Sequence, residues 1–359
     1  MSIFCSLALL KISIMYIKKN FTLQDILNFS GGHLIWLSCW ATLVTILYET
    51  MDWGWMRIPW LPLSVIGTAV AFYVGFKNNS SYDRMWEARK IWGAIVNSSR
   101  MWATTSKNYV SNQFRADSQE EAELSKWHQL LVYRHIAWLY TLRSQLLIPT
   151  PWEHVNQNSH VRRTNEKRRL TWGININDHT VTNEAQQEFL SKEDREKLAN
   201  VKNKATQIID LQSQTLKQLR AENLIDDFRH VELQNLLNDF YTHQGKAERI
   251  KKFPFPRQYG SMSFIFIGIF IFLLPLGMVS EFDKLEGWET WLSIPFTVLV
   301  GWIYLMMELV GDYSENPFEG LGNDIPMLSL CRTIEIDLKE MLGETNIPPG
   351  IEAKYGVLM

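Results

Sequence analysis

Residues 61–89 read LPLSVIGTAVAFYVGFKNNSSYDRMWEAR, and the character of this segment changes halfway along. It carries no charge before Lys77, it is polar from Lys77 onward, and no proline interrupts it after Pro62. A soluble helix has no reason for such a division along its length, whereas a helix that leaves a membrane and continues into water does. We therefore predict one long helix whose first half spans a membrane.

Small and aromatic residues share the apolar half of this helix. Thr68, Phe72 and Phe76 are spaced four residues apart and so lie on one face. The glycines and alanines at 67, 69, 71 and 75 offer small surfaces for close helix packing. An aromatic stripe at this spacing is more often part of a core. A ring of several copies of the chain would instead place it around a pore, as a hydrophobic constriction.

The composition bounds the class of protein. The chain has 359 residues, of which 46% are hydrophobic, and a mean hydropathy of −0.13. These values exclude a transporter made almost wholly of membrane helices and suit a few spans with a sizeable hydrophilic part. A formal net charge of −2 gives no case for nucleic acid as a partner. The three cysteines are scattered and indicate no disulfide framework.

Four apolar segments, residues 33–48, 58–76, 261–279 and 288–309, approach the length needed to cross a bilayer. The predicted fold class is an all-α membrane protein with four transmembrane helices and a large helical cytosolic region. We expect an N-terminal cytosolic segment (1–30), transmembrane helices one and two (31–76), a cytosolic helical region (77–257) with a polar loop near 152–188, transmembrane helices three and four (258–310), and a C-terminal cytosolic turn, helix and tail (311–359).

Basic residues set the expected orientation. They precede the first span, follow the second and precede the third, whereas the two remaining short loops hold one base each. The positive-inside rule then places both termini and the whole middle region in the cytoplasm. Residues 1–17 are apolar but broken by Lys11, and the segment from Met15 is typical of a natural amphipathic start. The start of translation stays open between Met1 and Met15.

Motifs of catalysis and metal binding give an enzyme little support. The sequence contains no HExxH, GxSxG or Walker motif and no GxGxxG after a strand. His128 and His135 are seven residues apart on one helical face, a spacing far more typical of ordinary histidines than of a metal site. Four acidic residues after the fourth span could serve a hard cation, although a solvated turn is the more common reading; they are Asp312, Glu315, Glu319 and Asp324.

Residues 75–93, GFKNNSSYDRMWEARKIWG, closely resemble the bacterial branch of the bestrophin family. Residues 245–250 (GKAERI) with 254–256 (PFP), and 315–318 (ENPF) with 323–326 (NDIP), resemble its segments before the third span and after the fourth. The resemblance covers residues 15–345. The motif residues to which it gives a structural role are Asn78, Asn79, Tyr82, Arg84, Glu87, Arg89, Asn316, Pro317, Phe318 and Asp324.

The resemblance implies a pentameric ion channel with one central pore, located in the inner membrane, rather than an enzyme. It places the pore neck at Thr68, Phe72 and Phe76. A second, cytosolic constriction falls on Phe228, with Ile225 one helical turn away as the alternative. Thr68 departs from the aliphatic residue usual at its position, so we expect a wetter outer neck here.

The resemblance also bears on calcium and on the permeant ion. Animal members bind calcium in an acidic run after Asn-Pro-Phe, but here glycines and a leucine occupy most of that run and only Asp324 matches. We therefore predict no calcium clasp, no calcium gating and no cofactor. Animal bestrophins pass chloride, whereas some bacterial relatives resemble cation channels. The closer bacterial match favours monovalent cations such as sodium, with chloride as the alternative.

Two other functions compete with a channel. The chain could be a membrane-anchored scaffold or regulator whose spans serve only as anchors, although an anchor needs no stripe of Thr68, Phe72 and Phe76. An ion-coupled transporter is weaker still, because the spans carry almost no buried charge for coupling. Glu308 near the inner end of the fourth span is the main exception, and we expect it to lie at the membrane interface.

Overall fold

A computed structural model describes residues 15–16, 20, 22–51, 56–115, 120–157, 179–285, 287–320, 324–353 and 357–358. These residues form two compact units. The first unit contains the described residues within Lys18–Met85 and Pro254–Asn316, and the second those within Ile14–Ile17, Trp86–Phe253 and Pro317–Met359. Most of the N-terminal segment before the first span, including the alternative start at Met1, lies outside the described residues.

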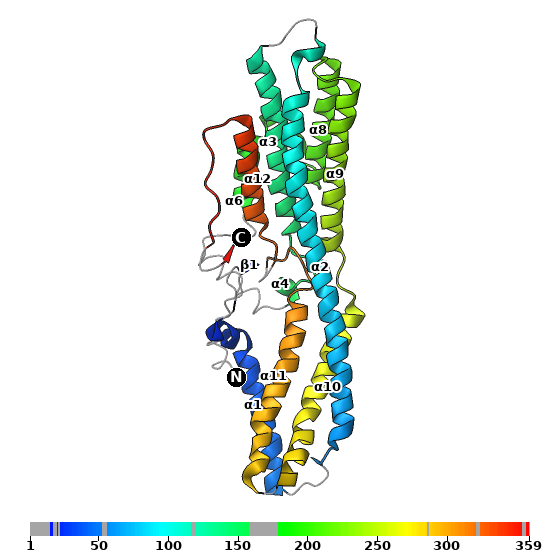
Figure 1. The fold of residues 1–359 in the computed structure, drawn as a ribbon, viewed down its shortest axis with the longest axis vertical. Coiled ribbons are helices and arrows are strands. Elements are labelled where there is room, and N and C mark those ends of the chain that lie inside the picture. The colour runs from blue at the N-terminus through cyan, green and yellow to red at the C-terminus, as the bar shows by residue number, and fades with distance from the viewer. Residues whose placement is uncertain are drawn as a thin grey trace. The chain divides into compact units, whose positions relative to one another are not determined.

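Long apolar helices build the first unit (Figure 1). They are α1 (Leu23–Met51), the first half of α2 (Trp60–Tyr109), α10 (Arg257–Phe282) and α11 (Ser293–Asp312), with short 3₁₀ turns at Asp283–Leu285 (η3) and Trp288–Leu292 (η4). Among the described residues, four helical stretches are long and apolar enough to cross a membrane. The predicted all-α membrane fold with four spans is therefore confirmed.

The core of the first unit is a continuous apolar cluster to which all four helices contribute. Leu37 of α1, Leu63 and Val74 of α2, and Phe270 and Leu274 of α10 are buried in it. Tyr304 of α11 packs against the cluster and donates a hydrogen bond from its hydroxyl to the Gly67 carbonyl, at 3.0 Å. The side of α2 that carries Leu63 and Val74 is thereby held against the other spans, which leaves its opposite side uncovered.

The second unit is a bundle of amphipathic helices. Its elements are the second half of α2, η2 (Asn112–Phe114), α3 (Glu121–Leu146), α4 (His154–Gln157), α6 (His179–Phe189), α7 (Lys192–Leu198), α8 (Lys204–Ala221), α9 (Asp227–Lys252) and α12 (Met327–Leu342). Trp102, Trp138 and Phe240 meet in its core around the buried ring of His135. A two-residue antiparallel pair, β1 (Met15–Tyr16) with β2 (Val357–Leu358), joins residues near the two ends of the chain.

The predicted polar loop near 152–188 is shorter than expected. Residues 158–178 lie outside the described residues, but 179–189 form the helix α6. Thr182, Ala185 and Phe189 are buried at spacings of three and four residues, and the Phe189 ring meets Tyr133 of α3 edge to face at 5.1 Å. One aromatic residue among polar ones is too weak a pattern to predict a helix, so packing against α3 decides it.

Candidate ion pore

The uncovered side of α2 carries the three residues predicted to form a neck. Phe72 is 69% exposed, Phe76 is 64% exposed and Thr68 is also exposed, whereas Val70 and Val74 on the opposite side are buried. The structure therefore brings the three residues together on one open face of the first unit. Exposed aromatic rings on a membrane-crossing helix meet lipid, another protein surface or a water-filled passage.

The open face of α2 has a defined local geometry. The rings of Phe72 and Phe76 lie edge to face, with centroids 5.5 Å apart and planes inclined by 61°. Thr68 donates its hydroxyl proton to the Ser64 carbonyl at 2.9 Å, so the hydroxyl oxygen keeps its acceptor capacity. The face therefore presents one weakly polar side chain followed by two aromatic rings, each a helical turn apart.

The two glycines of α2's apolar half have different surroundings. A Cβ at Gly67 would lie 2.8 Å from Phe270 Cε2 and 3.3 Å from the Tyr304 hydroxyl, so this glycine permits close packing within the chain. A Cβ at Gly75 would meet nothing within 4 Å. Of these two glycines, only Gly75 offers an open small surface to a neighbour outside the first unit.

A buried ion pair follows directly after Phe76 on α2. Lys77 on α2 and Glu308 on α11 form a salt bridge, and their side chains are 1% and 6% exposed. Ser263 of α10 donates a hydrogen bond to Glu308 Oε2 at 2.5 Å, and Asp312 Oδ1 lies 3.9 Å from Lys77 Nζ. Glu308 is thus buried within the first unit, against Lys77 of α2 and Ser263 of α10. Its depth in the membrane, which we expect to be the interface, stays a prediction.

Neighbouring motif residues extend the same attachment. Asn78 donates a hydrogen bond from Nδ2 to the Met307 carbonyl at 2.9 Å, and a Cβ at Gly311 would lie 2.0 Å from Asn78 Oδ1. The hydrogen bond requires the amide side chain of Asn78, and the close approach of Asn78 Oδ1 leaves no room for a side chain at Gly311. The other motif residues of α2 have varied environments. Asn79 donates a hydrogen bond to Asp83, and Tyr82 is exposed. Arg84 and Arg89 are partly buried, and Glu87 forms an ion pair with Arg249 of α9.

The motif after α11 forms a tight turn around Asp324. Its carboxylate accepts hydrogen bonds from the backbone N–H groups of Phe318, Gly320 and Ile325, at 3.0, 2.7 and 2.7 Å. Phe318 is fully buried with φ 68°, a conformation that costs energy for a residue with a side chain and needs such fixing. Asn316 is buried, donates to Glu315 Oε1 at 3.5 Å and precedes Pro317.

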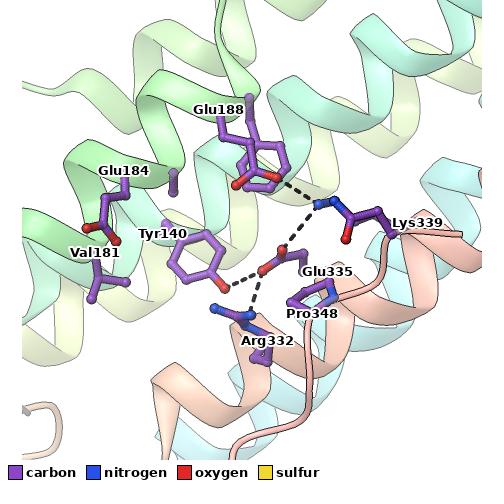
Figure 2. A pocket seen from close by; sticks show the side chains of 11 residues that line it. Tyr140, Val181, Glu184, Glu188, Arg332, Glu335, Lys339 and Pro348 are labelled. Atoms are coloured by element: carbon purple, nitrogen blue, oxygen red, sulfur yellow. Dashed lines mark hydrogen bonds and ion pairs between the residues drawn. The ribbon is translucent and has the colours of Figure 1, made fainter. Parts of the chain in front are cut away.

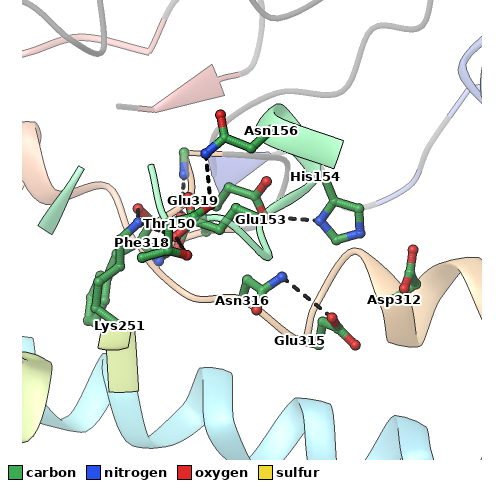
Figure 3. A network of polar contacts seen from close by, with 12 residues as sticks. Thr150, Glu153, His154, Asn156, Lys251, Asp312, Glu315, Asn316, Phe318 and Glu319 are labelled. Carbon is green, nitrogen blue, oxygen red and sulfur yellow. Dashed lines mark hydrogen bonds and ion pairs between the residues drawn. The ribbon is translucent and has the colours of Figure 1, made fainter. Parts of the chain in front are cut away.

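Buried charges hold the second-unit part of this turn (Figure 3). Lys251, near the end of α9, pairs with Glu153 and donates to the Phe318 carbonyl at 3.2 Å. His154 Nδ1 lies 3.0 Å from Glu319 Oε2. Glu153, Glu319 and Asp324 thus contact a lysine, a histidine and backbone N–H groups, respectively.

The two residues predicted for the cytosolic constriction have opposite environments. Phe228, in the first turn of α9, is 84% exposed, whereas Ile225 is fully buried in the core of the second unit. Ile225 therefore cannot present its side chain to a pore. Asp226 caps α9 by accepting the Arg229 backbone N–H at 2.8 Å, and the Arg229 guanidinium stacks on Phe114 at 4.8 Å, so the start of the helix is well fixed.

The histidines considered for a metal site have ordinary partners. His128 Nε2 lies 2.9 Å from the Val110 carbonyl, and His135 Nε2 lies 2.8 Å from Ser99 Oγ. Burial lowers the pKa of His135 to about 3. Within the part of the chain that the structure describes, no group of three or more His, Cys, Asp or Glu side chains is placed to hold a metal ion.

Sequence reasoning missed the pairing of Lys77 with Glu308. Lys77 appeared to be the first base on the aqueous side of the second span, and its partner lies 231 residues away. A single lysine directly after an apolar run and a single glutamate inside another were the only signals in the sequence.

Comparisons with known proteins agree along most of the chain. A family model described as bacterial/fungal bestrophin protein matches residues 20–340. The voltage-dependent anion channel-forming protein YneE of Escherichia coli strain K12 is 25% identical over 291 residues, which cover 81% of this chain and 79% of that protein. The voltage-dependent anion channel-forming protein mll4386 of Mesorhizobium japonicum is 27% identical over 288 residues, which cover 80% and 76%.

The fold has close counterparts among solved structures. The crystal structure of a bacterial bestrophin homologue from Klebsiella pneumoniae superposes with a TM-score of 0.68 at 21% sequence identity. The match covers 87% of this chain and 98% of that chain. The helical arrangement of the units is thus shared at low sequence identity.

Proposed function

Because the chain belongs to the bacterial and fungal bestrophin family, we propose that it forms a passive channel for monovalent ions, built from five copies around one central pore. The exposed face of Thr68, Phe72 and Phe76 carries the proposal. A protomer with four spans encloses no path by itself, whereas the open α2 faces of several copies can surround an axis. The two phenylalanine rings then form a hydrophobic neck, which conducts or closes according to its hydration.

A second constriction completes the proposed path. Phe228 projects from the fixed first turn of α9 and is 84% exposed, as a side chain in an open aqueous passage would be. We place this constriction, the middle region and both termini on the cytoplasmic side of the inner membrane. The excess of Lys and Arg around the corresponding span ends supports this orientation.

Ion flux from liposomes that contain the purified protein tests conduction. We expect flux down a salt gradient, and a higher flux for the variant with Phe72→Ala and Phe76→Ala, because removing both rings widens the neck and makes it wetter. Phe264→Ala is the matched control, because Phe264 is an equally exposed phenylalanine that lies on α10 and not on the proposed pore-lining face of α2. Absence of flux under every gradient, with all proteins correctly folded, would favour the membrane-anchored scaffold instead.

The sign of the permeant ion is decided by reversal potentials in asymmetric salt. The close match to the bacterial motif favours monovalent cations, whereas the curated relatives carry the names of anion channel-forming proteins. The neck residues are uncharged, and aromatic rings present negative faces or positive edges according to their orientation. Potentials near the potassium equilibrium value mean a cation channel, and potentials near the chloride value mean an anion channel.

We further propose that the channel works without a calcium clasp. The Asp324 carboxylate accepts three backbone N–H groups, burial raises its pKa, and Glu153 and Glu319 already contact Lys251 and His154. Carboxylates engaged in this way are poor ligands for a divalent ion, which needs several free oxygens. Bilayer currents should be the same with and without a chelator, and a reversible loss of current on chelation would contradict the proposal.

A further inference from the structure

A polar pocket opens in the second unit between α6 and α12, with α3 behind it (Figure 2). Its volume is about 250 Å³, enough for a small organic molecule. The chain segment after α12 lines one side of it through Asn346 and Pro348. Nothing in the proposed conduction path uses this pocket.

A network of ion pairs and hydrogen bonds between side chains closes one end of the pocket. Lys339 of α12 donates a hydrogen bond to Glu188 of α6 at 2.8 Å, and it also lies 3.7 Å from Glu335. Tyr140 of α3 donates its hydroxyl proton to Glu335 Oε2 at 2.5 Å. Tyr140, Glu335 and Lys339 are all buried, so these groups form a fixed wall.

Two further charged residues that the structure describes, Glu184 of α6 and Arg332 of α12, are not paired with each other. Glu184 lies one turn before Glu188 on α6, and Arg332 lies two turns before Lys339 on α12. Both side chains line the pocket, and between these two described residues there is no ion pair like that of Glu188 with Lys339. Figure 2 shows Glu184 on one side of the Tyr140 ring and Arg332 on the other.

Arg332 retains binding capacity toward the pocket. A guanidinium has five N–H donors in a planar fork that matches a carboxylate. The Arg332 side chain is 26% exposed and lines the pocket. Its Nε is buried 3.4 Å from Glu335 Oε2, an ion-pair contact, and is not the atom that faces the pocket. The guanidinium is therefore oriented by Glu335 without being saturated by it.

We propose that the pocket binds a small zwitterion of the amino-acid class, with its carboxylate on Arg332 and its ammonium on Glu184. Such a molecule supplies a negative charge for Arg332 and a positive charge for Glu184. A simple anion would face Glu184, and a simple amine would face Arg332, so each is disfavoured alone. Ala185, Phe189 and Pro348 supply apolar contacts for the ligand's carbon atoms.

Binding of free amino acids to the full-length protein in detergent tests the proposal. Heat denaturation and isothermal titration calorimetry would be run with each common amino acid, with acetate and with methylamine, all at neutral pH. We expect at least one amino acid to raise the melting temperature in a saturable way, because a ligand of the folded state stabilises it. Acetate and methylamine should not do so at the same concentrations.

Two charge-removing variants locate the site. Glu184→Gln and Arg332→Gln should each weaken binding at least about tenfold, as expected for the loss of a charge-assisted contact. Glu184 is exposed, so its variant leaves the fold intact even if Arg332→Gln disturbs Glu335. Glu193→Gln on α7 is the matched control and should bind as the unmodified protein does. The proposal is overturned if no amino acid binds, if acetate alone gives the same shift, or if Glu184→Gln binds equally well.

Discussion

Lys77 and Glu308 form a buried ion pair that joins α2 to α11. Their charges are almost fully buried and lie directly after Phe76 on α2. A buried ion pair does not by itself add much stability, because desolvation opposes the attraction, but removal of one partner leaves an uncompensated charge. Here Ser263 supplies an additional hydrogen bond to the carboxylate, which makes the pair geometrically specific.

Loss of one partner should therefore destabilise the first unit strongly. We expect Lys77→Met or Glu308→Leu alone to cost about 3–5 kcal/mol, and the double variant to recover part of this, because it leaves no unpaired charge. Heat denaturation in detergent measures the effect. Arg220→Gln, at the exposed pair with Asp227, is the control and should leave the melting temperature unchanged. Equal melting temperatures for the protein and its single variants would show that the charges are not buried as described.

His135 should make stability depend on pH in the second unit. Burial lowers its pKa from 6.5 to about 3, so between these values the unfolded chain binds a proton that the folded chain does not. Stability from this residue is then complete above pH 6.5 and is lost as the pH falls below it, by about 1.4 kcal/mol per pH unit. Melting temperatures between pH 7 and pH 4 measure the slope.

The variant His135→Phe keeps an aromatic ring but cannot titrate. Its melting temperature should fall less steeply with pH than that of the unmodified protein. Ser99→Ala is the control, because it removes the hydrogen-bond partner of His135 but leaves the buried histidine in place, so it should keep the slope. A variant without His135 that shows the full slope would assign the pH dependence to other groups.

At the scale of elements, sequence reasoning succeeded where the chain is apolar and local. The spans predicted at 33–48 and 261–279 fall inside α1 and α10, and Thr68, Phe72 and Phe76 do share an open face. It failed where contacts between residues far apart in the sequence determine the local structure or the burial of a side chain. Neither the burial of Ile225 nor the helix α6 could be read from a local pattern, because both follow from packing within the second unit.

The two glycines of α2 give a matched test at this scale. Gly67→Ala should cost about 1–3 kcal/mol, because the new methyl group overlaps Phe270, whereas Gly75→Ala meets open space within the protomer. Both changes bring the same gain in helix propensity, so they differ mainly in packing. In a detergent that dissociates the protein into protomers, heat denaturation of the two variants should show a lower melting temperature for Gly67→Ala only. Equal values would mean that Gly67 does not contact α10 as described.

At the scale of the whole molecule, the proposed pore requires an assembly. Native mass spectrometry from detergent should give a protein mass five times the 42.0 kDa of the chain. A monomer or dimer under conditions that preserve conduction would contradict a pore formed around an axis by α2. The number of copies was not readable from periodicity or composition. The fold of a protomer sets which face is open, but the angle between neighbouring copies sets how many close the ring.

The pairing of Lys77 with Glu308 also has a consequence for biogenesis. Lys77 is synthesised 231 residues before its partner, which at 5–20 residues per second corresponds to roughly ten to fifty seconds of translation. During that interval the lysine at the end of the second span has to extend its amine toward the lipid headgroups, because no carboxylate is there to receive it. Insertion of the first two spans and their final docking are then separate events. Until Glu308 is synthesised, α2 lacks its ion-pair attachment to α11.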